Sequence, residues 1–63
     1  MMKVVFYDAD NDKLLQFNSS ATWVCPSEGQ FVFINGCFHE VLEITHSYED
    51  KSNPALEIKL GEL

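Results

Sequence analysis

The chain has 63 residues, of which 46% are hydrophobic, 13% aromatic and 22% charged. This length gives one domain, residues 1–63, and the hydrophobic fraction excludes an intrinsically disordered chain. Ten Asp and Glu residues against four Lys residues and no Arg give a formal net charge of −6. That charge argues against direct nucleic-acid binding, because such affinity comes mostly from basic side chains.

The first residues, Met-Met-Lys-Val-Val, lack the layout of a secretory signal, and no apolar run is as long as a membrane span. We therefore expect a cytoplasmic protein without membrane contact. In that compartment Cys25 and Cys37 are expected as thiols, with one disulfide between them as the alternative.

The first half of the chain predicts a hairpin. Residues 3–8 (KVVFYD) and 13–18 (KLLQFN) are rich in strand-forming side chains, and the Asp and Asn residues between them form turns. Residues 22–25 (TWVC) are either the end of the second strand beyond a bulge or a short strand of their own. The next break is at Pro26 to Gly29.

The second half predicts another hairpin, formed by residues 31–34 and 37–48. The intervening Asn35-Gly36 pair fits a two-residue type I′ turn, whose central residues both need a positive φ. Residues 55–60 (ALEIKL) alternate apolar and charged side chains, as expected for a half-buried strand, and residues 61–63 are expected to fray.

The alternation slips within the long strand. A β-bulge near Leu42 and Glu43 would keep Val41 and Ile44 both inward and would bend the strand, as a small barrel requires. We predict an all-β fold, a small five- to six-stranded antiparallel SH3-like barrel, because closure hides the strand edges.

Some of these motifs carry a resemblance to known proteins. Pro26-x-x-Gly29, the run FVFI, Asn35-Gly36 and Val41-x-x-Ile44 resemble the central part of small SH3-like β-barrels, between residues 26 and 48. The opening FYDADND is similar to that of short uncharacterised bacterial and phage proteins. The resemblance implies an interaction module and assigns no catalytic residue. The chain departs from the basic, Arg-rich members that bind RNA.

Four side chains are of the kinds that bind zinc: Cys25, Cys37, His39 and His46. Their spacing lacks the close ligand pairs of zinc modules, so they are weak candidates, and small buried thiols with half-exposed imidazoles are the simpler interpretation. Cys37 and His39 share a strand face, as a nucleophile and its base would. Acidic surroundings raise a thiol pKa, however, and we predict neither an enzyme nor a cofactor.

The carboxylates Asp8, Asp10 and Asp12 have the spacing that opens a calcium loop. The loop pattern then fails, because Lys13 and two leucines follow and Ser19 stands where the final Glu belongs. A hairpin turn rich in Asp and Asn is the better interpretation.

The aromatic residues provide the candidate binding surface. If Val32 and Ile34 point inward, Phe31 and Phe33 point to solvent; the alternative is that both phenylalanines lie in the core. Exposed aromatic patches tend to mark protein interfaces. The expected interface, including neighbouring carboxylates, consists of Trp23, Phe31, Phe33, Phe38, Glu40, Glu43 and Tyr48.

The sequence thus predicts a non-enzymatic protein-interaction module whose protein partner has a basic surface. One version is an inhibitor encoded by a phage or mobile element, whose carboxylates imitate nucleic-acid phosphates; solubility is the simpler role for the same charges. The alternatives are a homodimer or larger homo-oligomer that buries the aromatic patch, and a small protein with a zinc or Cys/His site.

Overall fold

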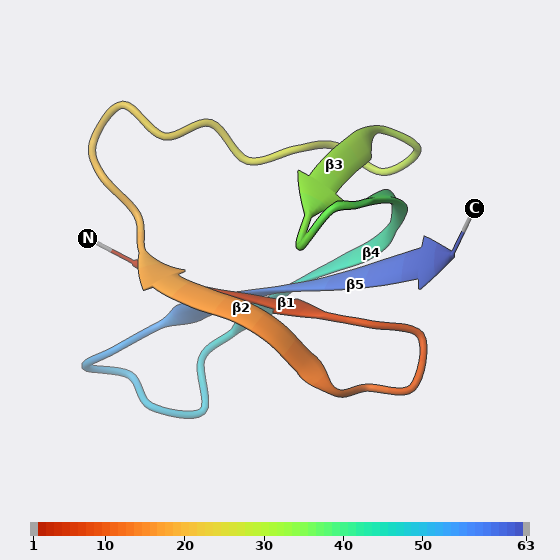
Figure 1. Cartoon of the computed structure of the whole chain (residues 1–63). Helices are drawn as coiled ribbons and strands as arrows, with labels where there is room; N and C mark the ends of the chain where they lie inside the picture. The colour runs from red at the N-terminus through yellow and green to blue at the C-terminus, as the bar shows by residue number, and fades with distance from the viewer. Residues whose placement is uncertain (1, 63) are drawn as a thin grey trace.

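The computed structural model describes residues 2–62, which form five β-strands (Figure 1). They are β1 (Lys3–Tyr7), β2 (Lys13–Asn18), β3 (Phe31–Ile34), β4 (Cys37–Ser47) and β5 (Ala55–Glu62). The expected all-β class is confirmed. Across residues 2–62, no helix is long and apolar enough to cross a membrane.

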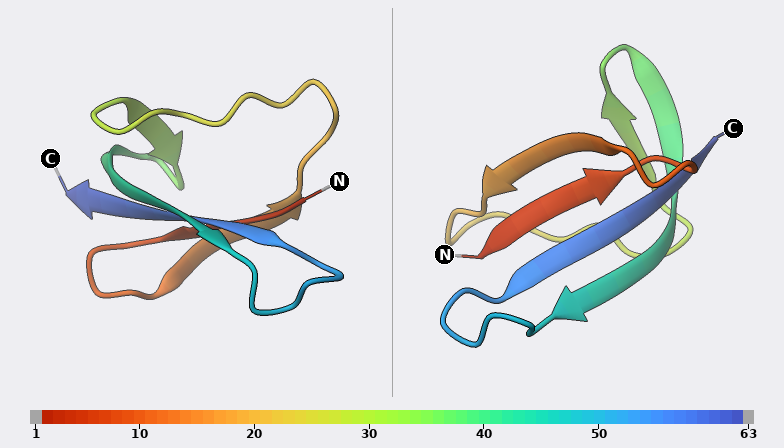
Figure 2. Two further views of the ribbon diagram at one scale, coloured as in Figure 1. Left: turned by 180° about the vertical axis from the view of Figure 1, so that it is seen from behind. Right: turned by 90° about the horizontal axis from the view of Figure 1, so that it is seen from below.

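The strands form one sheet in the order β2-β1-β5-β4-β3, which coils into a nearly closed barrel (Figure 2). Three of the four neighbouring pairs are antiparallel, but β1 and β5 pair in parallel. The expectation of an antiparallel sheet throughout is wrong at this pair. A parallel pair needs a long connection, and here the connection consists of the other three strands.

The core lies on the inner face of β5, the central strand. Leu56, Ile58 and Leu60 are almost completely buried, and they pack with Val4 and other apolar side chains of β1 and β4. The charged residues between them face the other side, as the alternation predicted. The central strand therefore contributes the largest share of the core.

The bulge in β4 lies where the sequence predicts it. Val41 pairs with Leu60 and Glu43 pairs with Lys59, so Leu42 is the additional residue. Val41 is buried, and Ile44 packs partly buried against the same core. The bulge reconciles a strand of eleven residues with a single buried face.

The turn between β1 and β2 is organised by Asp8. Its Oδ1 accepts hydrogen bonds from the backbone N–H groups of Asp10 and Asp12, both at 2.9 Å. Asn11 has a φ of 66°, a left-handed conformation that Asn tolerates. The turn-forming role predicted for these residues is confirmed.

Two other expectations are wrong. Residues 19–30 contain no strand, so TWVC belongs to a loop that runs from β2 to β3, in which the Trp23 N–H donates to the Ser20 carbonyl at 3.2 Å. Gly61 and Glu62 belong to β5 and do not fray, because Gly61 is buried beneath Leu42; Leu63 lies outside the described residues.

The Asn35-Gly36 turn generates a first prediction. Gly36 has a φ of +81° and open space around it, so a side chain there meets backbone strain alone. Gly36→Ala is expected to lower the free energy of unfolding by about 1 kcal/mol. Gly36→Asn is the matched control and should cost less, because Asn adopts this conformation more readily. Urea denaturation measures both, and equal losses for Ala and Asn would contradict the turn geometry.

The contact between Leu42 and Gly61 generates a second prediction. A Cβ placed on Gly61 would lie 2.8 Å from Cδ1 of Leu42. We expect Gly61→Ala to destabilise the wild-type protein by less than about 1 kcal/mol, since the added methyl group displaces the half-exposed Leu42 side chain, which is free to shift towards solvent. In a Leu42→Ala background the same change should be neutral or stabilising.

A double-mutant cycle in urea gives the coupling between the two positions. Additive effects would show that Leu42 does not fill this space.

Candidate protein-binding surface

Three phenylalanines lie together on the outer face of the β3–β4 hairpin. Phe33 pairs across the strands with Phe38, and Phe31 pairs with Glu40. The exposed fractions of Phe31, Phe33 and Phe38 are 59%, 62% and 59%. We refer to these three residues as the phenylalanine face. Together they form an apolar surface that a single chain leaves in water.

The register of the hairpin explains why the phenylalanines face outward. Asn35 and Gly36 have φ values of 52° and 81°, as a type I′ turn requires, and the turn closes on the pair of Ile34 and Cys37. Ile34 is buried, and Val32 packs partly buried against the core. Since alternate residues point to opposite faces, the alternative with both phenylalanines in the core is wrong.

The rings of Phe33 and Phe38 form an edge-to-face pair. Their centroids are 4.8 Å apart and their planes make an angle of 64°. Such a pair contributes about 0.5–1.5 kcal/mol beyond the burial of its area. The contact orders the two side chains relative to each other.

Leu42 adds to the apolar area beside this hairpin. The bulge turns Leu42 to the outer side of the sheet, where it is 49% exposed and covers Gly61, the neighbour of Glu40 across β4 and β5. The bulge thus gives the core two inward residues and places one large apolar side chain outside.

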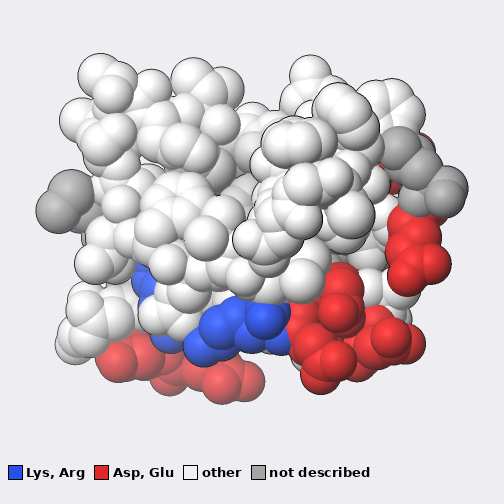
Figure 3. Space-filling model, viewed as in Figure 1, with Lys and Arg blue, Asp and Glu red and all other residues white. Residues whose placement is uncertain are grey.

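Charged residues are nearly absent from the segment that comprises β2 after Lys13, the following loop and the β3–β4 turn. Between Lys13 and Glu40 the only charged residue is Glu28. Figure 3 shows the result: the surface over the loop and β3 is uncharged, and acidic and basic side chains occupy its lower and right margins. The phenylalanine face is therefore apolar and neutral, with Glu40 beside it on β4.

The structure separates the other expected interface residues from this face. Trp23 is half-buried and packs edge-on against Phe17, at a centroid distance of 5.6 Å. Tyr48 is exposed but follows the far end of β4. Glu43 lies beyond the bulge, opposite Lys59. Of the expected set, Phe31, Phe33, Phe38 and Glu40 are brought together.

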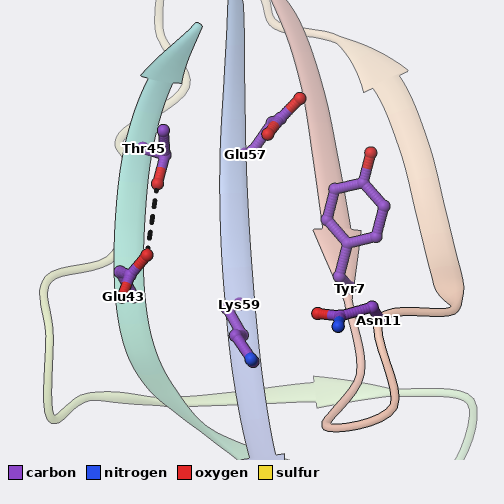
Figure 4. Close-up of a pocket in the computed structure, with 6 residues that line it drawn as sticks. All are labelled: Tyr7, Asn11, Glu43, Thr45, Glu57 and Lys59. Atoms are coloured by element: carbon purple, nitrogen blue, oxygen red, sulfur yellow. Dashed lines mark hydrogen bonds between the residues drawn. The ribbon is translucent and has the colours of Figure 1, made fainter.

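Glu43 instead lines an open polar hollow of about 270 Å³ on the outer face of β1, β5 and β4 (Figure 4). The Thr45 hydroxyl lies 3.5 Å from the Glu43 carboxylate within it. The hollow is lined by Tyr7, Asn11, Glu43, Thr45, Glu57 and Lys59. Sequence reasoning missed it, because its residues come from separate strands. Its mixed charges give no preference for one ligand.

The thiols and imidazoles are dispersed. Cys25 lies in the loop and Cys37 at the start of β4, and both are free. Cys37 and His39 line a small hollow with Phe38 and Glu62, whereas His46 pairs with Leu56 towards the other end of β4. Among residues 2–62, no three His, Cys, Asp or Glu side chains are grouped so as to hold a metal ion.

Comparisons of this chain with protein-family models, curated proteins and solved structures found no match.

The two thiols generate a third prediction. Burial raises the pKa of the Cys25 thiol, whose Sγ also donates a weak hydrogen bond to the Pro26 carbonyl at 3.3 Å, whereas Cys37 is exposed. Because the thiolate is the reactive form, a raised pKa lowers reactivity at neutral pH. We expect iodoacetamide to modify Cys37 faster than Cys25 at pH 7.5, with Cys25 catching up as the pH rises.

Peptide mass spectrometry measures the two rates, and the unfolded protein in urea is the control, in which the rates should converge. Faster modification of Cys25 in the folded protein would contradict its placement.

Proposed function

We propose that this protein is a non-enzymatic protein-interaction module that docks through the phenylalanine face. One observation carries the proposal: three large aromatic side chains on adjacent strands stay more than half exposed on one face of a small, acidic protein. Aromatic residues are favoured anchors in protein interfaces, where their burial supplies much of the binding energy.

The chemistry of the face limits what it binds. It presents rings and aliphatic carbon, with a carboxylate at Glu40 as its nearest charge. Such a surface suits another polypeptide better than a polar metabolite or a nucleic acid, because apolar area is buried against apolar area. The preformed contact between Phe33 and Phe38 supports the same role, since ordered side chains lose less entropy on binding.

Partners of two kinds fit this proposal. A protein with a basic surface would be attracted by the net charge of −6, and an inhibitor of such a protein belongs to this class. A second copy of the chain would instead meet the neutral face directly. The charge distribution distinguishes them, because β3 carries no charge and the surface over it is uncharged in Figure 3.

A photo-crosslinking experiment tests the proposal and identifies the partner in the same step. Benzoylphenylalanine replaces Phe33 in one variant and Leu15, an exposed apolar residue of β2, in the matched control. We expect the probe at position 33 to crosslink to a polypeptide in the source cell in preference to the probe at position 15, with mass spectrometry identifying the product. Equal crosslinking from both positions, or none from position 33, would reject the docking face.

A further inference from the structure

The backbone at the outer edge of β3 is the starting point. β3 is the last strand of the sheet order, so one of its sides has no neighbouring strand. The Val41 N–H donates to the Gln30 carbonyl at 2.8 Å, so Gln30 and Val41 form a hydrogen-bonded pair just before β3. Along an antiparallel ladder, hydrogen-bonded pairs alternate with pairs that share no hydrogen bond. Val32 and Ile34 are therefore the bonded residues of β3, whereas Phe31 and Phe33 direct their N–H and C=O groups away from β4.

These groups form a free hydrogen-bonding edge. Within residues 2–62, no turn, loop or side-chain hydrogen bond engages the backbone of Phe31 or Phe33. The edge thus offers two donors and two acceptors, carried by the same two residues whose side chains form most of the phenylalanine face. Such an edge is a template for an added strand.

The edge also lacks the usual protection against pairing. Natural edge strands carry Lys, Pro or inward-pointing charges that discourage a neighbour. The opposite edge of this sheet, β2, follows that rule with Lys13 and the polar residues Gln16 and Asn18. β3, with the sequence FVFI, has no charge and no proline. The two edges of one sheet therefore differ in their readiness to pair.

We propose that β3 of a second copy of this chain adds to this edge in antiparallel orientation, making a two-fold symmetric dimer. This inference rests on the proposed function and names the partner of the same face. With the symmetry axis at Val32, Phe31 lies opposite Phe33 of the second copy, and each such pair exchanges two hydrogen bonds. Four hydrogen bonds then join two five-stranded sheets into one.

The edge is self-complementary, which favours a second copy. A two-fold interface needs the same patch on both chains, and two donors with two acceptors centred on one residue meet that condition. The symmetry also places phenylalanine opposite phenylalanine on the outer face, and aromatic cross-strand pairs stabilise antiparallel strands. Phe38, which pairs with Phe33 within each chain, adds a third ring to each of the two symmetric rows.

The charge distribution points the same way. A basic partner would be drawn to the acidic turns and to the carboxylates of β4 and β5, whereas β3 itself carries no charge, and two copies with like charge can meet only where charge is absent. The nearest carboxylate, that of Glu40, lies on β4. In the dimer the two Glu40 residues are separated by three strand spacings, about 14 Å, and are offset along the strands as well, so their distance exceeds the Debye length of about 8 Å at physiological salt.

Sedimentation velocity of the purified protein at micromolar concentration tests the dimer. We expect the wild-type chain to sediment as a dimer. Phe33→Asp should sediment as a monomer with an unchanged far-ultraviolet circular dichroism spectrum, because Phe33 is exposed in the single chain, whereas in the dimer each new carboxylate would lie against the ring of Phe31 and diagonally across the axis from the other carboxylate.

A second variant separates strand addition from simple burial of the rings. A chain of 63 residues is accessible to chemical synthesis, so the amide of Phe33 can be N-methylated while its side chain is kept. N-methylation of Gln16 is the matched control, because its amide also points to a free sheet edge, that of β2. The Ser19 N–H donates to the Met2 carbonyl at 2.8 Å, and bonded and unbonded pairs alternate from there, so the Gln16 amide is directed away from β1. We expect the Phe33 form to raise the dissociation constant at least about tenfold and the Gln16 form to leave it unchanged.

A monomeric wild-type chain throughout the micromolar range would overturn the inference. A dimer that tolerates N-methylation of Phe33 would overturn strand addition as its basis. Crosslinking from position 33 to a different protein, together with a monomeric chain, would overturn the dimer and leave the proposed function standing.

Discussion

The two-residue turn between β3 and β4 fixes the register in which these two strands pair. Asn35 and Gly36 both adopt a positive φ, so the pairing of the hairpin is fixed from Ile34 and Cys37 outward. Because side chains alternate, burying Ile34 and Val32 obliges Phe33 and Phe31 to face water. The apolar surface, the contact between two of its rings and the free backbone edge all follow from this one register.

The local features of the fold could be predicted from the sequence. The Asn-Gly turn, the Asp8 turn and the slip in β4 each have a cause within a few neighbouring residues, and the structure shows all three. The parallel pairing of β1 with β5 has no local cause, because it depends on how the whole chain closes. It was therefore outside the reach of pattern reasoning.

In the candidate site too, the sequence predicts the placement of residues that depends on local register and not the placement that depends on distant contacts. Phe31, Phe33, Phe38 and Glu40 belong to one hairpin, so their common face follows from register alone. The burial of Trp23 depends on the path of the loop over Phe17, and the separation of Glu43 from Glu40 depends on the bulge and the partner strand β5. Residue type and spacing carry no information on such three-dimensional neighbours.

The placement of β5 has a consequence for how the chain folds. The hairpins β1–β2 and β3–β4 occupy opposite sides of β5, so the last of these five strands to be synthesised is the one that joins them. Until residues 55–62 leave the ribosome, each hairpin lacks its main packing surface, and two-stranded hairpins alone are marginal in water. Assembly of this sheet is therefore a late event governed by contacts between distant residues, which slow folding relative to local ones.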